Sequence, residues 1–113
     1  DIKTVGYCGL MLPVCEDTRL AQLAEGSAAR RLTIRDLLNI SAVCGVGIDT
    51  VPLKGDCDKE DLMSLILDVA GLAGRWKKSL SCRVFPVPGA APGEATTFDS
   101  PYLCNTSVFH LNQ

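Results

Sequence analysis

A chain of 113 residues, 47% apolar and 21% charged, has the length of one domain and enough apolar material to bury a core, which argues against intrinsic disorder. Its net charge is −2 and no sizeable group of Lys and Arg occurs, so nucleic acid is not an expected partner, because phosphate binding needs clustered cations. No apolar run reaches the roughly 18 to 20 residues that cross a bilayer, and therefore no membrane span is expected.

The first half of the chain predicts a strand, two helices and a second strand. Residues 4–8 form a short, partly β-branched apolar stretch typical of a strand, and Glu16 opens a helix that runs to about Ala24. Thr33, with an acid three residues later, predicts the capped start of a second helix. The apolar run from Val46 to Leu53 then predicts a strand that ends near a proline or lies at a sheet edge.

The segment from Asp58 to Lys78 carries the clearest periodicity. Its polar residues recur every three or four positions and leave an apolar side, which predicts an amphipathic helix of about five turns covering one face of a sheet. The apolar side consists of Leu62, Leu65, Ile66, Val69, Ala73 and Trp76.

The last third of the chain predicts a strand over residues 80–85, an irregular loop over 86–93 and a short returning strand over 106–109. Strands that alternate with helices indicate an α/β fold with a parallel sheet and right-handed crossovers. The strands are few and the helices do not suffice to cover both faces, so the sheet is partial. We therefore expect residues 1–113 to form a single segment of a larger protein.

The six cysteines bear on the compartment. They fall below the roughly 8 to 10% that marks a disulfide scaffold, and no two of them form a Cys-x-x-Cys pair. We interpret them as reduced, mostly buried thiols, which predicts an intracellular, reducing compartment. The cytoplasm is the first choice and an organelle is the alternative. No metal site is expected.

Four stretches of the chain are familiar in combination: Gly6 to Asp17, Ser41 to Leu53, Gly55-Asp56, and Phe98 to Tyr102. In this order they resemble the C-terminal region of uncharacterised protein family 0210, also called domain of unknown function 711. The resemblance covers nearly the whole chain. It implies a parent several times longer and an α/β barrel of the pyruvate formate-lyase and anaerobic ribonucleotide reductase type, for a family without an established activity.

Cys44 is the thiol of greatest interest. It ends the second predicted helix within the stretch that best matches the family, and the barrel resemblance places such an element near a central cavity, where a thiol can act as nucleophile or radical carrier. The alternative is a small buried core residue. The negative end of a helix dipole raises the pKa of a thiol, which works against a catalytic thiolate.

Acidic and hydroxyl side chains at predicted element boundaries form the second candidate group. Asp49 is a candidate catalytic residue, while Glu16, Asp17 and Thr50 are candidate binding residues. Ligands of parallel α/β sheets bind at the carboxyl ends of strands, and paired carboxylates there can transfer protons or hold a cation. The alternatives are helix-capping acids for Glu16 and Asp17 and a turn residue for Asp49.

Three functions remain open. The first is an enzyme acting on a small polar metabolite, with Cys44, Asp49 and Glu16 meeting at one cavity. The second is a non-catalytic subunit whose apolar faces are buried against the remainder of its own polypeptide or against other protein subunits. The third is a regulator that binds a small molecule without a nucleophile. No cofactor can be identified.

Overall fold

The computed structural model describes residue 3, residues 9–26 and residues 31–112. The strand predicted over residues 4–8 lies outside these ranges, as does Cys8. The elements in chain order are α1 (Thr18–Glu25), α2 (Ile34–Ser41), β1 (Gly47–Lys54), α3 (Lys59–Trp76) and β2 (Ser81–Val87). This is the predicted order of helices and strands, with each boundary within a few residues. In the described ranges, every helix is too short or too polar to cross a membrane.

Strand β1 is central to the sheet. On one edge it pairs in parallel with β2, which follows it through α3. On its other edge it bridges to Pro13 near the start of the chain and to Phe109 near the end, while Leu10 bridges to Gly45 just before β1. The backbone N–H groups of Val14 and Phe109 donate to the carbonyls of Asp49 and Pro52, at 3.2 and 2.9 Å. The predicted returning strand over 106–109 is thus reduced to isolated bridges.

Side-chain caps fix where the helices begin. Thr33 Oγ1 accepts a hydrogen bond from the backbone N–H of Asp36 at 3.2 Å, and Asp36 Oδ2 accepts from the backbone N–H of Thr33 at 3.0 Å. This reciprocal pair confirms the predicted capping box of α2. Asp58, the first residue of the predicted helical segment, caps α3 by accepting from the N–H of Glu60 at 2.9 Å.

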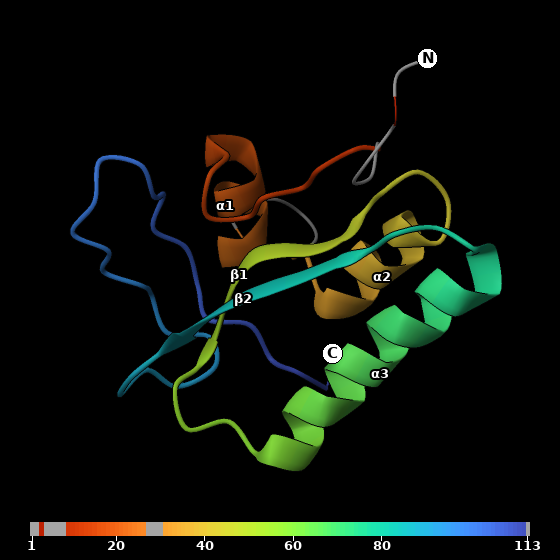
Figure 1. Ribbon diagram of the computed structural model, residues 1–113. Helices are drawn as coiled ribbons and strands as arrows, with labels where there is room; N and C mark the ends of the chain where they lie inside the picture. Colours follow the sequence, from red (N-terminus) through yellow and green to blue (C-terminus); the bar gives the residue numbers. More distant parts are fainter. Residues whose placement is uncertain (1–2, 4–8, 27–30, 113) are drawn as a thin grey trace.

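The core lies between the strands and helices α2 and α3, and Ala24 of α1 also belongs to it. Figure 1 shows α3 on the side of the strand pair away from α1. Leu65 and Val69 of α3 are buried there, as the periodicity predicts. Ile66 and Trp76 were expected on the same side, and this expectation is wrong, because their side chains are 49% and 51% exposed. The apolar stripe of α3 is wider than a sheet of two strands can cover. The main members of the core are Val14, Ile34, Leu37, Ile48, Val51, Leu53, Leu65, Val69 and Phe109.

Candidate functional site

A guanidinium group bridges two carboxylates across the sheet. Arg83 on β2 donates from Nε to Asp49 Oδ1 on β1 at 2.6 Å and from Nη2 to Glu16 Oε2 at 3.2 Å. Glu16 comes shortly after Pro13, which bridges to β1 on the edge opposite β2. The three side chains therefore connect β2, β1 and the segment that contains Pro13. The hydrogen bond that Arg83 donates to Asp49 is the largest effect that raises the pKa of Arg83 above its ordinary value. We call Glu16, Asp49 and Arg83 the Arg83 cluster.

The alternation of side chains along a strand places the cluster on one face of the sheet. Val84 packs against the core that includes Leu65 and Val69 of α3. Successive side chains of a strand point to opposite faces, so Arg83 lies on the face away from α3. Asp49 contacts Arg83 on that same face, and its side chain is only 3% exposed. The sheet therefore separates an apolar side covered by helices from a side that carries buried charge.

The backbone and side chains at Asp49 and Thr50 depart from ordinary strand structure in three ways. Asp49 Oδ2 is buried and has no hydrogen-bond partner among the described residues, which costs about 1 to 3 kcal/mol for a buried polar atom. Thr50 has a φ of 44°, a rare conformation for a β-branched residue. The pairing of β1 with β2 is irregular between Ile48 and Val51. Bulges and strained residues concentrate at functional sites, so these three features single out this position.

Thr50 is held firmly in its unusual conformation. Its side chain is fully buried, and both Oγ1 and the backbone carbonyl accept from the N–H of Cys15, at 3.1 and 3.2 Å. These bonds fasten the segment that carries Glu16 to β1. The position of Glu16 beside Arg83 thus depends on Thr50.

The structure brings together three of the five candidate residues. Glu16, Asp49 and Thr50 meet at the Arg83 cluster. Asp17 instead caps α1 by accepting from the N–H of Leu20 at 2.8 Å. Cys44 is exposed in the turn after α2, and within the described residues no hydrogen bond joins its side chain to the cluster.

Asp49 occupies a place in the strand that neither sequence interpretation expected. It is the third residue of β1, and it therefore lies neither in a turn nor at the carboxyl end of the strand. Arg83 was absent from the predicted site. Its signal in the sequence is a single charged residue inside the apolar strand from Leu80 to Phe85, but its partners depend on strand pairing.

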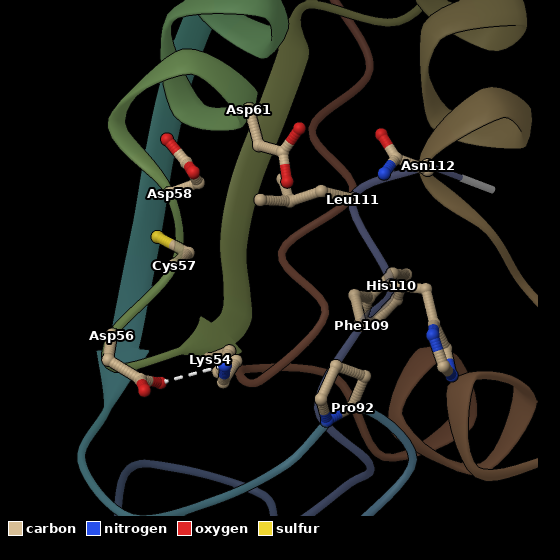
Figure 2. Close-up of a pocket in the computed structure, with 10 residues that line it drawn as sticks. All are labelled: Lys54, Asp56, Cys57, Asp58, Asp61, Pro92, Phe109, His110, Leu111 and Asn112. Atoms are coloured by element: carbon tan, nitrogen blue, oxygen red, sulfur yellow. Dashed lines mark ion pairs between the residues drawn. The ribbon is translucent and has the colours of Figure 1, made fainter.

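The carboxyl end of β1 opens into a separate polar pocket of about 490 Å³ (Figure 2). Lys54, the last residue of β1, forms an ion pair with Asp56 at 3.3 Å. Asp61 and His110 also line the pocket, while Asp58 caps α3. Among the described residues, no group of three or more His, Cys, Asp and Glu side chains is arranged to hold a metal ion.

Cys15 lies directly beside the cluster. Its backbone carbonyl accepts from the N–H of Cys104 at 2.6 Å, and its thiol is fully buried. Burial, with smaller effects from Cys104 and Glu16, raises the pKa of the Cys15 thiol to about 12. The five described cysteines are all free.

We expect Cys15 to resist alkylation at pH 8. A pKa of about 12 leaves it protonated, and only the thiolate reacts. Iodoacetamide should modify it about 1000-fold more slowly in the native protein than in the denatured protein, and the native rate should rise with pH. Peptide mass spectrometry over time gives both rates. Equal rates in the native and denatured states would contradict the buried position.

Comparisons with known proteins identify relatives. The profile of the family described as Uncharacterised ACR (DUF711) matches residues 1–101. A UPF0210 protein from Pyrobaculum islandicum is 38% identical over 89 residues, which are 79% of this chain and 19% of the relative. A UPF0210 protein from Methanopyrus kandleri is 37% identical over 89 residues, again 79% of this chain and 19% of the relative. One from Desulforudis audaxviator is 36% identical over 107 residues, which are 95% of this chain and 23% of the relative. The chain thus spans about a fifth of the length of these curated relatives. No solved structure matches significantly.

Proposed function

The chain belongs to the DUF711 family, whose curated members carry the name UPF0210, and we propose that it supplies part of a catalytic site for a small polar metabolite inside a larger α/β barrel. Helices surround the outside of such barrels, and the opposite face of the sheet points inward. The Arg83 cluster occupies the face away from α3, which supports an inward position. The chain would then be one segment of the barrel domain.

The unpaired oxygen of Asp49 carries this proposal. A buried carboxylate oxygen without a partner is costly, and a substrate hydroxyl or ammonium group would satisfy it. In this arrangement Asp49 accepts a proton or a hydrogen bond from the substrate, while Arg83 holds the carboxylate in place and offers its remaining N–H groups to an anionic substituent. Glu16 orients Arg83. Cys44 stays outside this site because it is exposed in the turn after α2.

A regulator that binds the same metabolite without turnover would use the same contacts. The enzyme and the regulator differ only in whether the bound molecule is converted. The free state of the five described cysteines supports a reducing, intracellular compartment for either function.

The test uses the full-length protein and a panel of small carboxylic acids, phosphate esters and amino acids. At least one compound should raise the midpoint of thermal unfolding of the native protein, because a ligand that binds only the folded state stabilises it. The variant Asp49→Asn should lose this shift. Asp56→Asn removes the same charge from an exposed side chain outside the cluster and should keep the shift.

Two outcomes would overturn parts of the proposal. A shift that is unchanged in Asp49→Asn would place the ligand elsewhere. For a compound that passes this first step, NMR spectra recorded during incubation show whether it is converted. Binding without conversion would support the regulator and exclude the enzyme for that compound.

A further inference from the structure

Helix α3 presents apolar side chains on a side that nothing in the described structure covers. Met63, Ile66 and Leu67 are 59%, 49% and 62% exposed, and Ala70 is exposed as well. Residues spaced three and four apart share one side of a helix. These four residues therefore form a continuous apolar strip, which we call the open face of α3.

The open face points away from α2. Asp61, Ser64 and Asp68, from the polar side of α3, line a groove together with Ile34 and Arg35 of α2. The polar side of α3 therefore faces its neighbouring helix. The apolar strip lies on the other side of the buried residues Leu65 and Val69, where the described structure has no further helix.

Strand β2 has an unpaired edge. The N–H of Ser81 donates to Val46, and the carbonyl of Val87 accepts from Gly55, so these residues direct their backbone toward β1 and its ends. Because backbone groups of alternate residues point to opposite edges, Cys82, Val84 and Pro86 direct theirs outward. In the described chain, no strand pairs with that edge. Pro86, which lacks an N–H, is at a position typical of proline in edge strands.

The open face and the unpaired edge are on the same flank of the molecule. Across the sheet, the segment of Leu10 and Pro13 is followed by β1 and then β2. On the helical layer, α2 contacts β1, while α3 contacts β2 and has α2 on its polar side. The sheet therefore ends at β2 and the helical layer ends at α3 on the same flank of the molecule. Its surface has the profile of a domain interior: a row of free backbone groups beside an apolar helix face.

We propose that this flank binds a strand and a helix from the remaining polypeptide of the full-length protein. The strand continues the sheet alongside β2, and the helix packs on the open face of α3. The curated relatives contain about four-fifths of their length outside the matched region, which is ample chain to supply such a unit. This inference does not depend on a catalytic role of Asp49.

The first test places a charge on the open face within the full-length protein. Leu67→Lys should lower the midpoint of thermal unfolding by roughly 5 °C or more, because a lysine would be buried against apolar neighbours. Ser64→Lys is at an exposed position that lines the polar groove between α3 and α2, which Leu67 does not line, and it should change the midpoint by less than about 1 °C. Equal, small effects of both variants would overturn the proposal.

The second test needs no substitution and covers the case in which Leu67→Lys fails to fold. Hydrogen peroxide converts the Met63 thioether to the sulfoxide and is itself reduced to water. In the folded full-length protein this oxidation should be at least about tenfold slower than in urea, because the open face is covered. Oxidation at the denatured rate would show an exposed face and overturn the proposal.

The same oxidation distinguishes a second copy of the protein as occupant. If Met63 stays protected on dilution while the protein sediments as a monomer in the analytical ultracentrifuge, the covering segment belongs to the same polypeptide. Protection that disappears as a dimer dissociates would show that the flank is an interface between copies, and the proposed occupant would be wrong.

Discussion

Replacing Gly47 with alanine should lower the free energy of unfolding by about 3 kcal/mol, because both its conformation and its surroundings exclude a side chain. Its φ of 102° is one that other residues rarely adopt. A Cβ atom would overlap the carbonyl oxygen of Ser81 and lie 2.6 Å from its nitrogen. Both are backbone atoms of the first residue pair between β1 and β2, so the strands would have to separate. Denaturant unfolding of the full-length protein measures the loss.

Gly71→Ala provides the matched control. Gly71 lies inside α3, and a Cβ atom there would meet nothing within 4 Å. Alanine should raise the free energy of unfolding by about 0.8 to 1 kcal/mol through its higher helix propensity. If both substitutions stabilise the protein, Gly47 does not lie as close to the backbone of Ser81 as the structure places it.

Arg83→Met should have the second largest effect, a loss of about 2 kcal/mol in the free energy of unfolding, since Asp49 is buried but the Arg83 side chain is 51% exposed. Methionine preserves much of the aliphatic volume but leaves the carboxylate of Asp49 buried without its cation. Removing the cation that neutralises a buried carboxylate is more harmful than removing both charges. The double variant Arg83→Met/Asp49→Asn should therefore recover part of the loss.

A double-mutant cycle measures this coupling directly. The interaction energy between Arg83 and Asp49 should exceed about 1 kcal/mol, as for other contacting residues in one network. Glu16→Gln, on the 39% exposed partner of the same guanidinium, should cost less than about 1 kcal/mol because water screens that pair. Additive effects of the Arg83 and Asp49 substitutions would show that the hydrogen bond does not stabilise the fold.

The features that the sequence predicts well are local. The capping box of α2 joins Thr33 to Asp36, only three residues away. The long helix α3 repeats its pattern over 18 residues, which leaves little ambiguity in its type. The α/β fold class follows from the alternation of such elements, and it is confirmed.

The features that the sequence does not predict depend on distant pairing. Arg83 contacts residues that are 34 and 67 positions away, and neither partner is evident before the strand order is known. Asp49 is interpreted as a turn residue from its neighbours, whereas pairing on both edges of β1 buries it. The periodicity of α3 shows which residues are apolar but not how many neighbours cover them, so Ile66 and Trp76 were assigned to the core.

The pairing of β1 also has a consequence for the order of folding. The hydrogen bond between Ser81 and Ile48 spans 33 residues and that between Cys15 and Thr50 spans 35, so both edges of β1 close loops of similar length at similar entropic cost. The edge of β1 opposite β2 takes its partners from opposite ends of the chain, at Pro13 and at Phe109. During synthesis, β1, α3 and β2 leave the ribosome before Phe109 does. The contact of Phe109 with β1 is therefore completed last.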